Sequence, residues 1–202
     1  MNAFRALRLF LWLLVPVAAF VAAGYYFTVV RAPADSGGVA VNAPLGGPFQ
    51  LVDGDGKPVT ESIFRDEPSA VFFGFTHCPD VCPTALSDMA QWIDALGADA
   101  DRMRFVFVTV DPERDTPEVM KEYVGAFSPK IMGVTGEPAK VTSMLDDYHI
   151  YYRKVPTEGG DYSMDHSASI FLLNGRGELT GTISPDESGD SAVAKLKRLV
   201  AG

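Results

Sequence analysis

The sequence has little cysteine and little histidine, and both shortages limit the chemistry that the chain can support. Its 202 residues include only two cysteines, Cys78 and Cys82, and three histidines. Two cysteines cannot build a disulfide-rich miniprotein or an all-cysteine zinc site, so they act as one pair or singly. Short sequence repeats are absent, which excludes collagen-like and solenoid architectures. A hydrophobic content of 47% excludes a disordered chain.

Basic residues are also scarce, with 17 lysines and arginines against 26 aspartates and glutamates. The first 31 residues hold three of the arginines and no acid, so the remainder has 14 basic and 26 acidic residues, a balance of −12. An acidic surface repels phosphate backbones, so nucleic acid is not expected as a partner. Such a surface is mostly solvated, and it also favours docking to a basic patch on another protein.

Residues Leu9 to Val30 form a run of 22 residues without a charge. As a helix this run is roughly 33 Å long, which is enough to span a bilayer. Arg5 and Arg8 precede it and only Arg31 follows, so the positive-inside rule places the rest of the chain outside the cytoplasm. A cleaved signal peptide is the alternative. An uncleaved anchor is favoured because the apolar run continues through Phe27, beyond the small residues that a cleavage site needs.

The segment after the apolar run is rich in Ala, Gly, Pro, Ser and Asn, a composition that cannot bury a core and that is typical of a tether. We therefore expect a protein of the bacterial inner membrane whose C-terminal domain lies in the periplasm. The predicted parts are a cytoplasmic tail, a transmembrane anchor, a flexible tether and one folded domain, over residues 1–8, 9–30, 31–47 and 48–202.

Within the folded domain, short apolar runs alternate with helical periodicity, which predicts an α/β fold with a central mixed sheet flanked by helices. A β-hairpin precedes these units, and the order of the elements is that of a thioredoxin-like domain with insertions. Residues 156–165 are predicted to be a polar loop. Strands are expected over 49–52, 58–60, 70–75, 104–110, 131–135, 151–155, 167–173 and 178–183, and helices over 83–96, 117–127, 138–148 and 192–200.

The two cysteines lie where the first core strand of the α/β units gives way to its helix, a junction at which α/β sheets place their sites. Residues four apart share a helix face, so the sulfurs of Cys78 and Cys82 can bond each other or hold one ion. Amides at a helix N-terminus also stabilise thiolate. A structural disulfide is the alternative, but so short a loop removes only on the order of 2 kcal/mol of unfolded-chain entropy. Redox or metal chemistry is therefore favoured.

A third candidate, His166, is predicted to lie in a polar loop immediately before a strand, where a thioredoxin-like fold brings it close to the cysteines. Two thiolates and one imidazole suit copper, because Cu(I) prefers sulfur and Cu(II) accepts imidazole. Zinc is the alternative, since two cysteines, one histidine and a water form a known catalytic zinc set. Spacing alone decides neither between these metals nor between a ligand and a loop residue.

Four segments in chain order resemble the Sco/SenC family over roughly residues 48–200: FTHCPDVCP from Phe75, VTVDPERDTPE from Val108, FSPKIMG from Phe127 and DHSASI from Asp165. The resemblance implies a membrane-tethered, thioredoxin-like copper metallochaperone that helps assemble the binuclear copper centre of cytochrome c oxidase. Its implied ligands for Cu(I) and Cu(II) are Cys78, Cys82 and His166. The expected partners are the copper-binding subunit of the oxidase and an upstream copper donor in the periplasm.

Two functions of different kinds follow from this pattern. A copper carrier binds and delivers its metal without catalysis. A thiol-disulfide reductase would instead keep the cysteines of the oxidase centre reduced, with Cys78 and Cys82 cycling between dithiol and disulfide. The cysteine spacing of four and the lack of a proline before Ser167 oppose the simplest form of the reductase. A peroxidase is less favoured still, because Phe75 and Pro79 stand where peroxidatic cysteines carry Thr or Ser.

Overall fold

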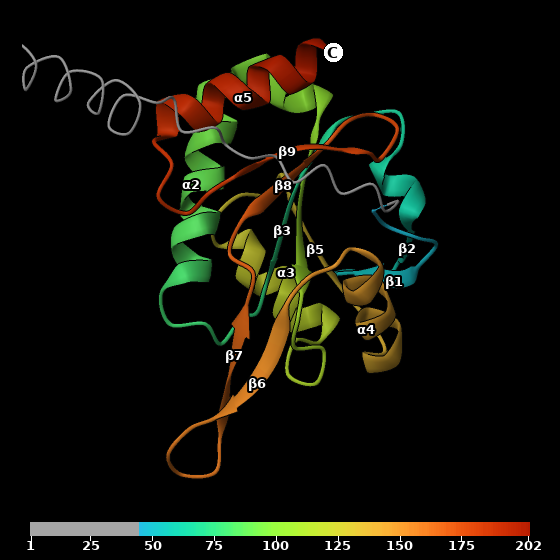
Figure 1. The fold of residues 1–202 in the computed structure, drawn as a ribbon, viewed down its shortest axis with the longest axis vertical. Helices are drawn as coiled ribbons and strands as arrows, with labels where there is room; N and C mark the ends of the chain where they lie inside the picture. Colours follow the sequence, from blue (N-terminus) through green and yellow to red (C-terminus); the bar gives the residue numbers. More distant parts are fainter. Residues whose placement is uncertain (1–44) are drawn as a thin grey trace, which may run out of the picture. The chain divides into compact units, whose positions relative to one another are not determined.

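The computed structural model describes residues 45–202, whose helices and strands are drawn in Figure 1. The predicted tail, the predicted anchor and residues 31–44 of the predicted tether lie outside the described residues. Among residues 45–202, no helix combines the length and the apolar composition that crossing a bilayer requires.

Seven strands form one mixed sheet in the order β2-β1-β5-β4-β3-β8-β9. The central strands β3, β4 and β5 run parallel, whereas β1, β2, β8 and β9 join by antiparallel pairing. This arrangement confirms the predicted mixed sheet. The strand bounds are β1 Gln50–Asp53, β2 Pro58–Thr60, β3 Ser69–Gly74, β4 Arg104–Thr109, β5 Ile131–Thr135, β8 Ile170–Leu173 and β9 Leu179–Ile183.

The central strand β3 is buried along its whole length, which explains why its sequence is a continuous apolar run. Its side chains alternate between the two faces of the sheet. Phe72 packs against Phe107 of β4, with 5.8 Å between ring centroids. On the opposite face, Phe73 packs against Tyr148, which follows a helix, at 6.0 Å. Both faces of the sheet are therefore part of the hydrophobic core.

Helices cover both faces of the sheet, as the sequence pattern predicts. Helix α2 carries Cys82, whose sulfur lies on the Gly74 side of β3, and α5 packs against α2 (Figure 1). Tyr123 of α3 packs against Phe107, so α3 covers this same face. Helix α4 ends beside Tyr148 and covers the other face. The helix bounds are α2 Val81–Leu96, α3 Pro117–Gly125, α4 Pro138–Asp147 and α5 Gly189–Ala201, with short 3₁₀ helices η2 Glu61–Phe64 and η3 Gly97–Arg102.

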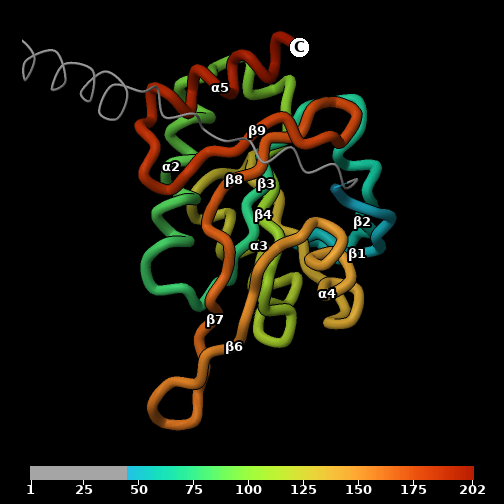
Figure 2. The backbone as a smooth tube through the Cα atoms, in the orientation of Figure 1, coloured from blue at the N-terminus to red at the C-terminus, as the bar shows by residue number. Residues whose placement is uncertain are grey.

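The predicted polar loop over residues 156–165 is wrong in its second half. Strands β6, Tyr152–Pro156, and β7, Tyr162–His166, pair as a separate antiparallel hairpin that projects from the seven-stranded sheet (Figure 2). Of the residues in β7 only Met164 is buried, so the strand lacks the apolar alternation from which strands are recognised. His166 consequently ends a strand rather than lying in a loop, and β8 begins at Ile170 instead of Ser167.

Candidate metal centre

The two cysteines lie at the junction between β3 and α2, as the sequence predicts. Asp80 occupies the N-cap position of α2, but its side chain makes no capping hydrogen bond. The backbone N–H of Cys82 donates instead to Sγ of Cys78, at 3.4 Å. The positive end of the helix is therefore directed at the Cys78 sulfur.

The third residue, His166, reaches the cysteines from the end of β7. Its Nε2 lies 3.5 Å from Sγ of Cys82, and its Nδ1 lies 2.9 Å from the backbone oxygen of Ser167. Because a carbonyl oxygen only accepts hydrogen bonds, Nδ1 carries the proton and the lone pair of Nε2 faces the sulfur. The rings of Phe72 and Phe75 pack edge-on against the imidazole and hold its orientation. Their centroids lie 6.1 and 5.7 Å from the centroid of the imidazole ring.

The structure thus brings together all three residues that the sequence singles out. Donor atoms of Cys78, Cys82 and His166 all lie within 4.8 Å of one another. Both cysteines are free thiols, Cys82 fully buried and Cys78 partly exposed. Two sulfurs and one imidazole nitrogen therefore converge on one point, from elements 84 residues apart in the chain.

Burial controls the protonation of two of these groups. Removal from water raises the pKa of the Cys82 thiol far above its ordinary value, and the neighbouring Cys78 raises it further. Burial lowers the pKa of His166, against the hydrogen bond to Ser167. At neutral pH the metal-free centre therefore holds a protonated Cys82 thiol and a neutral imidazole.

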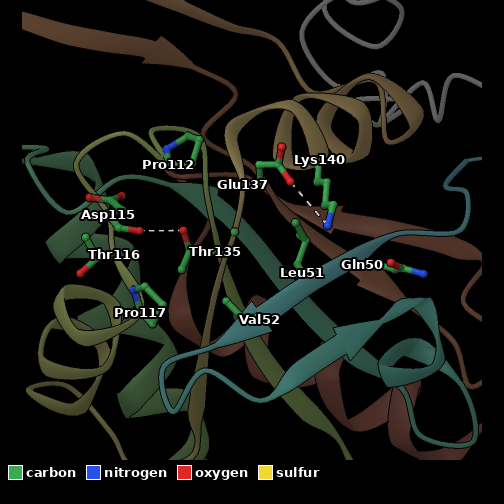
Figure 3. Close-up of a pocket in the computed structure, with 11 residues that line it drawn as sticks. Gln50, Leu51, Val52, Pro112, Asp115, Thr116, Pro117, Thr135, Glu137 and Lys140 are labelled. Atoms are coloured by element: carbon green, nitrogen blue, oxygen red, sulfur yellow. Dashed lines mark hydrogen bonds and ion pairs between the residues drawn. The ribbon is translucent and has the colours of Figure 1, made fainter.

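A buried carboxylate, Asp115, holds the cysteine loop in place. Its oxygens accept hydrogen bonds from the backbone N–H of Thr76 at 3.1 Å, from the Thr76 hydroxyl at 2.6 Å and from the Thr109 hydroxyl at 2.6 Å. Thr135 donates to the backbone oxygen of Asp115 at 2.6 Å (Figure 3). Burial raises the pKa of Asp115, while its hydrogen bonds to Thr109 and Thr76 oppose that rise. Since Thr76 is two residues from Cys78, these hydrogen bonds of Asp115 fix the beginning of the loop that carries Cys78.

The loop between β4 and α3, which carries Asp115, also holds the hairpin that carries His166. The Arg114 guanidinium stacks over the Tyr162 ring, 3.8 Å from its centroid, and the Tyr162 hydroxyl donates to Asp111 at 2.8 Å. Asp111 also accepts a hydrogen bond from Arg114. These contacts join residues about fifty positions apart in the chain and therefore leave no local signal in the sequence.

The metal centre is separate from the hollow drawn in Figure 3. That hollow, of about 320 Å³, lies between β1, the start of α3 and the start of α4. Asp115 lines it, but Cys78, Cys82 and His166 do not. The three donor atoms therefore form a compact site for an ion rather than part of this larger cavity.

Comparison with known proteins identifies the family. The family model described as SCO1/SenC matches residues 38–201, most of the chain. The chain belongs to the SCO1/SenC family. The resemblance seen in the sequence is thereby confirmed, and the mixed sheet with flanking helices is the thioredoxin-like fold of Sco proteins.

Individual Sco proteins match the same region. The mitochondrial protein SCO1 homolog 1 of Arabidopsis thaliana is 43% identical over 139 residues, which are 67% of this chain and 41% of that protein. Mitochondrial SCO2 of Saccharomyces cerevisiae is 36% identical over 172 residues, 83% of this chain and 56% of that protein. The chain thus spans about half the length of these relatives. The structure of Bradyrhizobium japonicum ScoI with copper bound is 44% identical, with a TM-score of 0.72, and covers 77% of this chain and 99% of that one.

Proposed function

We propose that this Sco-family protein binds copper through Cys78, Cys82 and His166 and delivers it to the binuclear copper centre of cytochrome c oxidase. The observation that carries the proposal is the convergence of the three donor atoms within 4.8 Å. The copper bound to the related ScoI of Bradyrhizobium japonicum supports the choice of metal. The oxidase as recipient follows from the resemblance to the Sco/SenC family.

The donor set fits copper in both oxidation states. Two sulfurs suit Cu(I), and a neutral imidazole with a free Nε2 also suits Cu(II). Zinc fits less well as a structural ion, because a closed zinc site needs a fourth ligand that the described residues do not supply here. Copper is the cargo of the protein, and thiolate binding requires Cys82 to lose its proton, so the affinity falls as the pH falls.

Exposure of the donors gives the centre an inner and an outer side. Cys82 is fully buried, whereas Cys78 and His166 remain partly exposed. A ligand of the receiving protein therefore reaches the centre from the side of Cys78 and His166. Exchange of copper begins there, while Cys82 still holds the ion.

A second function, thiol-disulfide reduction, is favoured by one specific observation. Cys78 is the more exposed of the two cysteines, and its Sγ lies within reach of the backbone N–H of Cys82. In its thiolate form Cys78 can attack a disulfide of the oxidase subunit, forming a mixed disulfide that Cys82 then resolves. The oxidase cysteines would become reduced, and the Cys78–Cys82 pair would become oxidised.

Replacement of His166 by alanine separates the two functions in cells. The variant keeps both cysteines but loses a copper donor, so we expect cells that carry only His166→Ala to lose most oxidase activity. The measurement is oxidase activity in membranes of a deletion strain complemented with each variant. Cys82→Ser should abolish activity under either function. Full activity with His166→Ala, but not with Cys82→Ser, would favour the reductase.

We further propose that residues 9–30 anchor the protein in the bacterial inner membrane, with the Sco domain in the periplasm. The charge-free run and the arginines before it support this topology. Alkaline phosphatase, which is active only when exported, tests it as a fusion to Gly202. We expect an active fusion, and an inactive fusion that is stably produced would contradict the topology.

A further inference from the structure

A small, mostly apolar groove is lined by α2 on one side and by the segments that lead into β8 and out of β9 on the other. Figure 1 shows α2 alongside β8 and β9. The volume of the groove is about 180 Å³. We call it the docking groove, and its apolar lining includes Val81, Ala85, Trp92, Ala168, Ile170 and Ile183.

Each side of the docking groove includes a residue that lies close in the chain to a proposed copper donor. Val81 on one wall is the neighbour of Cys82, and Ala168 on the other wall lies two residues after His166. Val81 is also 40% exposed and is one of three large hydrophobic residues among residues 45–202 that are exposed to solvent. A segment seated in the groove would therefore lie next to two copper donors and would cover Val81.

The charge around the groove is acidic. Asp80, Asp88 and Glu187 line it, and no lysine or arginine does. Glu187 is paired with Lys195 at 2.7 Å. Asp80 and Asp88 form no ion pair with any of the described residues, so their charges remain available to a partner.

We propose that the docking groove binds the protein that receives the copper. Three features support this: the apolar lining, the acidic residues around it, and the closeness of its walls to Cys82 and His166 in the chain. The bound segment carries an apolar side chain flanked by lysine or arginine. The side chain fills the groove beside Val81, and the basic groups meet Asp80 and Asp88. This inference rests on the proposed function, and it adds the surface that holds the two proteins together during exchange.

The test uses two variants that alter the groove without touching a copper donor. Thr84→Trp places a bulky side chain in the groove, from an exposed position whose hydroxyl makes no hydrogen bond to the described residues. Asp88→Lys reverses one rim charge. The matched controls are Ser87→Trp and Asp94→Lys, exposed positions on the same helix that do not line the groove.

The measurement is the Kd between the full-length protein and the purified copper-binding domain of the oxidase subunit from the same organism, by calorimetry. We expect Thr84→Trp and Asp88→Lys to weaken binding by about tenfold or more and the controls by less than about twofold. The proposal would be wrong if all variants bound the oxidase domain with equal affinity. It would also be wrong if the controls weakened binding as much as the groove variants do, or if the wild type showed no saturable binding.

Copper affinity, measured on the same samples, separates this inference from the proposed function. All four variants should bind Cu(I) as the wild type does, since none of them replaces or contacts a donor. If the wild type bound no copper, the proposed function would fail. If copper binding were intact but groove and control variants bound the oxidase domain alike, only the docking groove would fail.

Discussion

Replacement of His166 by alanine is expected to lower the affinity of the reduced protein for Cu(I) by about 100-fold or more. The change removes Nε2, which lies 3.5 Å from Sγ of Cys82, and leaves two sulfurs as the remaining donors. The measurement is an anaerobic competition titration against a Cu(I) chelator of known affinity.

His149→Asn is the matched control for this prediction. His149 is exposed, and its backbone has a φ of 53°, a conformation that asparagine tolerates well. The control should bind copper as the wild type does. If His166→Ala matched the wild type as well, His166 would not be a ligand.

Replacement of Asp115 by alanine is expected to lower the free energy of unfolding by about 3 to 5 kcal/mol. Asp115 is fully buried, and its loss leaves the backbone N–H of Thr76 and the hydroxyls of Thr76 and Thr109 without their acceptor. The measurement is urea denaturation of the reduced, metal-free protein, followed by circular dichroism. Because Thr76 leads into the cysteine loop, the variant should also bind copper more weakly.

Two further variants support the Asp115 test. Asp94→Ala removes an exposed carboxylate and should change the free energy of unfolding by less than about 0.5 kcal/mol. Thr109→Val removes one of the hydrogen bonds to Asp115 and should cost about 1 to 3 kcal/mol, which keeps the test usable if Asp115→Ala does not fold. A stability of Asp115→Ala equal to that of Asp94→Ala would contradict the positioning role.

Local patterns were sufficient to predict most of the sheet and its helices. The strand over Ile131–Thr135 has its predicted bounds, because this mostly apolar run lies between a charged residue, Lys130, and a glycine, Gly136. Helix α3 begins at Pro117 after Thr116, whose side chain accepts a hydrogen bond from the N–H of Val119 as an N-cap should. The proximity of Cys78 and Cys82 was also predicted, but from a shared helix face, whereas α2 begins at Val81 and Cys78 lies in the loop before it.

Features that depend on distant residues were not predictable in this way. Only one of the five residues of strand β7 is buried, and the strand is defined by its pairing with β6, so its sequence resembles that of a loop. The buried role of Asp115 depends on Thr76, 39 residues away, and local pattern alone suggests helix initiation for such a residue. The place of His166 beside Cys82 came from an expected fold and a family resemblance, because spacing alone left its role open.

An anaerobic Cu(I) titration of the reduced full-length protein against a competing chelator tests whether Cys78, Cys82 and His166 form one copper site, as proposed. We expect the wild type to retain about one copper per chain and a Cys78→Ser, Cys82→Ser double variant to retain none. If the wild type gave up its copper to a weak chelator, or if the double variant held copper as tightly as the wild type, these residues would not form a copper site.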